Sequence, residues 1–102
     1  MKTIKLSKGK EKISLGAQND VDLDYSTVDY IKAVLNNRPQ DGFGVEDIRK
    51  RFRVLDAVEK IEEGTEELQL EDQDFEVLKQ CVNQFKWGVM ANSILEFADQ
   101  FK

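Results

Sequence analysis

The longest regular apolar pattern in this 102-residue chain lies between residues 45 and 61. Apolar side chains recur there every three or four residues, the spacing of one face of an α-helix: Val45, Ile48, Phe52, Leu55, Val58 and Ile61. The pattern predicts a helix from Val45 to about Glu62, with Gly64 suited to the C′ position that follows it. We expect this stripe to be buried, so that Phe52→Ala costs about 3–5 kcal/mol of stability.

Three other segments have helical periodicity and recognisable ends. The first begins after Ser26, a predicted N-cap, and stops before Pro39, while the second begins at Asp72 and ends near Gly88. The last begins near Ser93, which has capping-box spacing to an acid three residues later. The apolar residues expected on the buried faces of these helices are Val28, Ile31, Leu35, Phe75, Leu78, Cys81, Val82, Phe85, Ile94, Phe97, Ala98 and Phe101.

The first residues of the chain predict a β-hairpin. In TIKLSKGKEKISLG, residues 3–16, apolar and polar side chains alternate on both sides of a Lys-Gly-Lys centre. The apolar residues of each half share one face, as Ile13 and Leu15 do, and Gly9 is expected in the turn. Because a two-stranded hairpin is only marginally stable alone, its apolar face must lie on the remainder of the protein.

The acidic segment NDVDLDYS, residues 19–26, is similar to the start of a calcium-binding loop. Its aspartates match the first ligand positions, but such a loop also needs glycine at its sixth position and glutamate at its twelfth. This chain has Tyr25 and Ile31 there. We therefore interpret the segment as simple alternation, with Val21, Leu23 and Tyr25 on one face and the aspartates in water.

These elements predict a mainly α fold, a compact bundle of about four helices with an N-terminal β-hairpin as a minor β element. A chain of this length is expected to form a single domain, with residues 1–24 as the hairpin or extended arm and residues 26–101 as the helical bundle. Residues 65–72, TEELQLED, are expected to be a short extended connection. No apolar run approaches the roughly 20 residues of a membrane span, and no secretory signal is recognisable. A cytoplasmic protein is predicted, because the single cysteine fits a reducing compartment.

The residue content excludes several kinds of chemistry. The chain contains no histidine, which removes Ser-His-Asp and Cys-His catalysis and nearly every zinc site. Its one cysteine, Cys81, forms no intramolecular disulfide and falls on an apolar stripe, as a buried hydrophobic residue would. No pair of acids has a defensible catalytic spacing. We expect a protein that is not an enzyme, with no catalytic residue, no cofactor and no metal.

Residues 47–56, DIRKRFRVLD, concentrate bases in a chain of net charge −5. Exposed on a helix, Arg49, Lys50, Arg51 and Arg53 are suited to contacting nucleic-acid phosphates, and two helices around residues 37–44 suggest a helix-turn-helix. However, that loop is longer than the usual turn, and acids four residues before Lys50 and Arg51 favour ion pairs within the helix. We interpret the stretch as a solvated face; contact with nucleic acid and contact with an acidic protein are the alternatives.

Two other segments leave alternatives open. The apolar sequence WGVM, residues 87–90, suits either closure of the core or an exposed docking patch. The segment Glu62–Glu76 has eight acids and no base, which suits either a hydrated loop and helix start or a basic partner. The residues predicted to bind a partner are Arg49, Lys50, Arg53, Trp87 and Met90.

Three stretches resemble small proteins encoded by tailed phages and prophages: NNRPQDGFGVEDIRKRFRVLDAVEK, LQLEDQDFEVLKQCVNQFKW and SILEFADQF, within residues 36–101. The resemblance implies a phage or prophage origin and a role in virion assembly or in the control of a host machine, but it assigns no functional residue. We therefore expect a small acidic protein that binds another phage or host protein, in the host cytoplasm or in the virion. The alternative is a small DNA-binding transcriptional regulator. Binding to a membrane is not expected, and the oligomeric state is left open.

Overall fold

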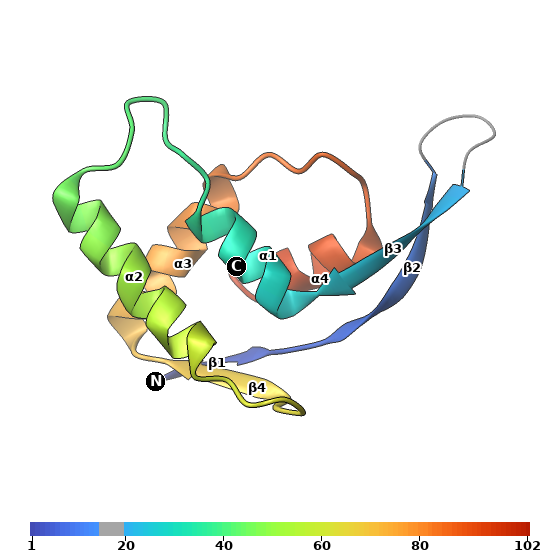
Figure 1. Cartoon of the computed structure of the whole chain (residues 1–102), viewed down its shortest axis with the longest axis horizontal. Helices are drawn as coiled ribbons and strands as arrows, with labels where there is room; N and C mark the ends of the chain where they lie inside the picture. Colours follow the sequence, from blue (N-terminus) through green and yellow to red (C-terminus); the bar gives the residue numbers. More distant parts are fainter. Residues whose placement is uncertain (15–19) are drawn as a thin grey trace.

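Strands and helices both build this fold, as Figure 1 shows for a computed structural model that describes residues 1–14 and 20–102. In chain order the elements are β1 (Lys2–Lys5), β2 (Lys8–Ser14), β3 (Asp20–Ser26), α1 (Thr27–Leu35), α2 (Val45–Glu59), β4 (Glu67–Leu70), α3 (Asp72–Gln84) and α4 (Asn92–Asp99). β1 pairs antiparallel with β4, and β2 pairs antiparallel with β3. The prediction of a mainly α bundle is therefore wrong, because the fold is α+β with two two-stranded sheets.

The predicted hairpin of residues 3–16 is also wrong. Its expected turn residue, Gly9, lies inside β2 opposite Tyr25, and a Cβ atom at Gly9 would be 3.1 Å from the Tyr25 hydroxyl oxygen. The chain instead leaves the first sheet after β1 and enters the second sheet at Lys8. Leu15, predicted to share a face with Ile13, lies outside the described residues. Pairing β1 with β4 buries Ile4 completely, which an isolated hairpin cannot do.

The β2–β3 ribbon has one charged face and one largely apolar face. Lys10 stands opposite Asp24 and Lys12 opposite Asp22, and both aspartates are exposed. Directly opposed residues share a face in an antiparallel pair, so these aspartates have lysines as neighbours. The predicted alternation of residues 21–25 is confirmed, and cross-strand charge accounts for its aspartates.

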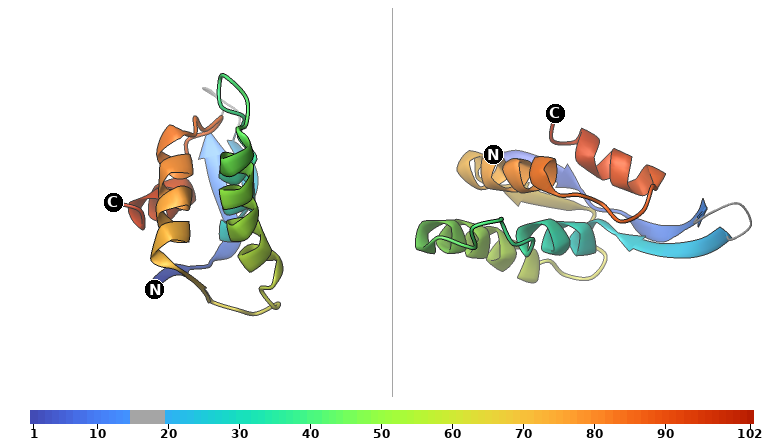
Figure 2. Two further views of the ribbon diagram at one scale, coloured as in Figure 1. Left: turned by 90° about the vertical axis from the view of Figure 1, so that its left-hand side faces the viewer. Right: turned by 90° about the horizontal axis from the view of Figure 1, so that it is seen from above.

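The core lies between the β1–β4 sheet and the helices. Figures 1 and 2 show α2 and α3 side by side, with β1 and β4 crossing below them. Side chains from both strands and from all four described helices fill the space: Ile4, Ile31, Val34, Leu35, Val54, Val58, Leu68, Leu70, Leu78, Cys81, Val82, Phe97 and Phe101. The predicted inner faces of α1, α3 and α4 are largely confirmed, because their ends and apolar spacing are local properties of the sequence.

The prediction that the apolar stripe of α2 is buried is wrong for Phe52, its central residue. The buried side chains on this helix are Arg51, Val54 and Val58, whereas Phe52 is 60% exposed and Val45 is 66% exposed. Val54 and Val58 lie one turn apart and face the sheet, which turns Phe52 toward solvent. The aromatic part of the core comes instead from α3, α4 and the segment between them.

A carboxylate from the ribbon fixes the start of α4. The Asn92 amide donates to Glu11 Oε2 at 2.6 Å, and the Ser93 amide donates to Oε1 at 2.9 Å. These bonds, that of Ser93 first, lower the pKa of the Glu11 carboxyl. The N-cap residue is Ala91 and no side-chain cap comes from α4 itself, so the predicted capping role of Ser93 is wrong. Glu11 satisfies the free amides of this helix from 81 residues away.

Candidate protein-binding surface

Three predicted binding residues line one groove between α2 and α3. Arg49, Lys50 and Arg53 lie along a groove of about 750 Å³. Four acids share its lining with the four bases of α2, so the groove carries no net charge: Glu46, Asp47, Asp74 and Glu76. Such a mixed lining does not attract phosphates, because the acids repel what the bases attract.

Arg51, the fourth base of this stretch, faces inward and has a structural role. Its side chain is 8% exposed, and Nη1 donates to the carbonyl oxygens of Leu35 at 2.7 Å and Asn37 at 3.0 Å. Its Nε donates to Asp47 Oδ1 at 3.1 Å, which confirms the predicted pair. Leu35 ends α1, where carbonyl groups lack partners within the helix and a positive charge is favourable. Arg51 therefore ties the end of α1 to α2.

The other three bases differ in their availability. Arg53 Nε lies 3.4 Å from Asp74 Oδ1, and Asp74 is almost buried at the start of α3. Arg49 makes a 3.8 Å contact with Glu46, but both side chains are largely exposed, so the pair contributes little. Lys50 is exposed and forms no ion pair within residues 1–14 and 20–102. Arg49 and Lys50 are therefore the bases of α2 that a partner can engage.

A row of exposed side chains runs along the outside of α2. Val45, Arg49, Phe52 and Asp56 follow one another at intervals of four, three and four residues, so they share one side of the helix. We call these four residues the α2 outer row. Phe43, just before the helix, is 39% exposed, and its ring centroid lies 5.0 Å from the guanidinium of Arg51, so it is not part of this row. Large exposed apolar side chains on one side of a helix, as Val45 and Phe52 are, are typical of protein-binding surfaces.

Sequence reasoning missed this surface because it assigned the apolar stripe of α2 to the core. Ile48, Leu55 and Ile61 of that stripe are partly buried, and Val58 alone is fully buried. A detectable signal was present, because Val54 and Val58 form a second apolar pair on another side of the same helix. When a helix has apolar residues on two sides, one side packs on the core and the other is available to a partner.

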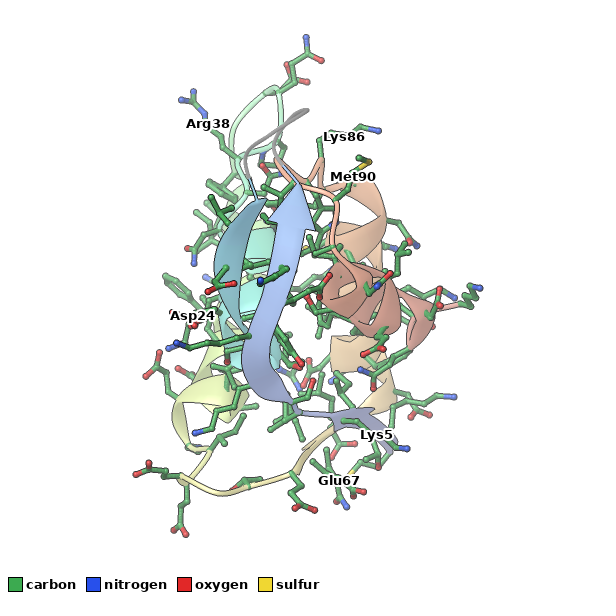
Figure 3. All side chains as sticks on the ribbon, turned by 90° about the vertical axis from the view of Figure 1, so that its right-hand side faces the viewer. Lys5, Asp24, Arg38, Glu67, Lys86 and Met90 are labelled. Atoms are coloured by element: carbon green, nitrogen blue, oxygen red, sulfur yellow. The ribbon has the colours of Figure 1, made fainter. Side chains whose placement is uncertain are left out.

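The WGVM segment divides between core and solvent. Trp87 is partly buried among aromatic rings, with centroids 4.6 Å from Phe85 and 5.2 Å from Tyr30. Met90 is 90% exposed and is labelled in Figure 3. In Figure 1 the connection between α3 and α4, which contains both residues, runs away from α2. The structure therefore does not bring Trp87 and Met90 to the α2 outer row.

No arrangement with catalytic geometry is present in the described part of the chain. Cys81 is buried, and burial raises the pKa of its thiol, which disfavours the reactive thiolate. Over the same residues, no group of three or more Cys, Asp or Glu side chains could hold a metal ion. A second groove of about 600 Å³, at the ends of α2 and β1, is lined by apolar side chains together with four acids and two bases, and it lacks a nucleophile with an adjacent base.

Comparison with known proteins gave no match: no family model, no curated protein and no solved structure is significantly similar to the chain. Among residues 1–14 and 20–102, no helix has both the length and the apolar character needed to cross a lipid bilayer.

Proposed function

We propose that this chain is a non-catalytic interaction protein that binds another protein through the α2 outer row. The observation that supports the proposal is the exposure of Phe52 and Val45 on a helix whose core contacts are made by other residues. Burying the exposed part of the Phe52 ring at an interface contributes about 1–2 kcal/mol, and aromatic side chains are common hot spots. The recognition mode is a helix laid into a groove, with anchors seven residues apart.

The charges around the α2 outer row indicate what kind of partner surface would complement it. Arg49 lies between the two apolar anchors, and Lys50 lies beside it on the groove side of the helix. A matching surface has an apolar centre for Phe52 and carboxylates at its rim for these two bases, which steer association and fix the register. From the resemblance to phage-encoded proteins, we propose a phage or host protein as the partner, in virion assembly or in control of a host machine.

The alternative, a DNA-binding regulator, has less support. It requires a continuous basic surface, but Arg51 is used inside the protein and Arg53 is paired with Asp74. Two bases remain, and Glu46 is in contact with one of them. A mobility-shift assay with mixed DNA at low salt separates the two functions, because binding lost in Arg49→Ala and weakened by salt would support the regulator.

Site-specific photo-crosslinking tests the proposed surface. A benzophenone amino acid is placed at residue 52 and, as a matched control, at Leu95, which is 62% exposed on α4. We expect residue 52 to crosslink one protein, through a segment with acidic residues, and we expect the charge reversal Arg49→Glu to abolish that product. Equal capture from both positions, or capture that Arg49→Glu leaves unchanged, would contradict the proposal.

A further inference from the structure

The β1–β4 sheet has two outer edges, and the protein closes one of them itself. On the β1 side, the Lys5 amide donates to Gln100 Oε1 at 2.7 Å, and Gln100 Nε2 donates to the Lys5 carbonyl at 3.2 Å. The side-chain amide of Gln100 therefore takes the place of a neighbouring strand. The β4 side has no such partner, because this sheet contains only β1 and β4 in the described part of the chain.

The register determines which groups of β4 face outward. The Leu6 amide donates to the Glu66 carbonyl at 2.8 Å, so hydrogen-bonded pairs recur at Ile4–Leu68 and Lys2–Leu70. The pairs between them do not bond across the ladder, and their N–H and C=O groups point away from the partner strand. The contacts of Gln100 with both backbone groups of Lys5 agree with this alternation. On β4 the outward groups belong to Glu67 and Gln69, and within the described residues they accept and donate no hydrogen bond.

The β4 edge lacks three of the usual protections against added strands. Residues 67–70, ELQL, contain no proline, bulge or lysine, so the short length of this four-residue strand and the charge of Glu67 are the protections that it has. Leu68 and Leu70 are buried beneath the helices, whereas Glu67 and Gln69 are exposed, and Figure 3 shows Glu67 at the lower margin of the molecule. The edge is regular, and its backbone groups are free to pair.

The charge around β4 determines which segments can pair with its free edge. No lysine or arginine occurs between residues 61 and 78, and five exposed acids flank or lie on β4: Glu62, Glu63, Glu66, Glu67 and Glu71. The bases of this sheet are Lys2 and Lys5 on β1, and Lys5 stands opposite Glu67. A second copy of β4 would bring acids against acids, which destabilises a strand pair. A segment with alternating basic residues meets the opposite charge.

We propose that the free edge of β4 binds an extended, lysine- or arginine-containing segment of another protein as a third strand. Backbone hydrogen bonds to Glu67 and Gln69 give the pairing, and the acids around β4 select basic side chains. This surface is separate from the α2 outer row, so the two proposals stand or fall independently.

The probe is a fluorescein-labelled peptide, Lys-Val-Lys-Val-Lys, titrated with the whole protein and followed by fluorescence anisotropy. We expect saturable binding that weakens at high salt. N-methylation of the alternate peptide amides that would face β4 should lower the affinity at least tenfold, because it removes hydrogen-bond donors but keeps the charge. In the protein, Gln69→Pro removes one outward N–H that the β1–β4 ladder does not use, and an edge strand tolerates proline. This variant and Glu67→Lys should each weaken binding at least tenfold.

Asp41→Lys is the matched control, since it makes the same charge change on the exposed loop between α1 and α2, at the opposite end of the molecule in Figure 1. We expect it to change affinity less than threefold. Equal binding of the N-methylated peptide, equal loss in Asp41→Lys, or no binding at millimolar protein would overturn the proposal. If circular dichroism shows that Gln69→Pro does not fold, Glu67→Lys and the N-methylated peptide still test the proposed strand pairing. Dimerisation of the protein that Gln69→Pro abolishes would show that a second copy is the occupant instead.

Discussion

Arg51→Ala should destabilise this protein far more than Phe52→Ala, although the two residues are neighbours on α2. The arginine guanidinium is buried and donates to two carbonyl oxygens at the end of α1, at 2.7 and 3.0 Å. Removing it leaves those acceptors without a charged donor and leaves a space between α1 and α2. The phenylalanine ring, by contrast, projects from the helix into solvent.

The magnitudes follow from these contacts. A buried group that loses its hydrogen-bond partner costs about 1–3 kcal/mol, so two carbonyls and the lost Asp47 pair amount to about 3 kcal/mol for Arg51→Ala. Phe52 is 60% exposed. The buried remainder of its ring then contributes about 1 kcal/mol to the free energy of unfolding. The higher helix propensity of alanine offsets about half of that loss in Phe52→Ala. For a domain of this size, the melting temperature should fall by roughly 12–24 °C in the first variant and by roughly 2–4 °C in the second.

Urea unfolding followed by far-UV circular dichroism measures both free energies at neutral pH. Arg53→Ala is the matched control, because Arg53 is a largely exposed arginine on the same helix, and it should cost less than about 1 kcal/mol. Each variant is measured at two protein concentrations, since a self-associated form would bury Phe52 and make its cost concentration-dependent. A loss of about 3 kcal/mol in Phe52→Ala, or equal losses in the two variants, would refute the assignment of α2's inner face.

Three further predictions concern other contacts. Glu11→Gln should destabilise the protein above about pH 4.5, because a carboxyl with a lowered folded-state pKa stabilises the fold only while it is ionised. The difference in free energy of unfolding from the parent should vanish as the pH falls. A difference that does not change with pH would contradict the carboxylate cap. Gln100→Ala should speed hydrogen exchange of the Lys5 amide about tenfold, the equivalent of one hydrogen bond, with the Leu68 amide as the control. Cys81 should react with a disulfide reagent slowly in the native protein and promptly in concentrated urea, since burial raises its pKa, and fast native reaction would show that the thiol is accessible.

Local signals were sufficient to locate the helices. Ser26 precedes α1, Asp72 begins α3 and Asn92 begins α4, close to the starts that residue type and apolar spacing indicate, although none of their N-cap residues makes a side-chain cap hydrogen bond. A helix start depends on a few consecutive residues, so it can be recognised without knowledge of the fold. The alternation around Ile4 was also correctly read as a strand, but its partner β4 lies more than sixty residues away. Strand pairing at that separation has no local signal.

The candidate surface could be predicted only in part. Arg49 and Lys50 were expected at the surface, and the structure places them there. The inner face of α2 could not be predicted from apolar spacing, because a charged residue occupies a core position. Arg51 is buried, and its guanidinium donates to carbonyl oxygens of another segment. That role depends on where α1 ends in space, which the residues around Arg51 do not encode.

The contacts of β1 also determine when this protein can finish folding during its synthesis. Ile4 pairs with Leu68 of β4, and the Lys5 amide donates to Gln100 near the C-terminal end of the sequence. At translation rates of about 5–20 residues per second, the sixty or so residues between β1 and β4 correspond to roughly 3–12 s in which β1 has no partner. Lys2, Lys5 and Lys8 flank the apolar residues of this waiting strand. We expect their charges to disfavour aggregation of this segment during those seconds.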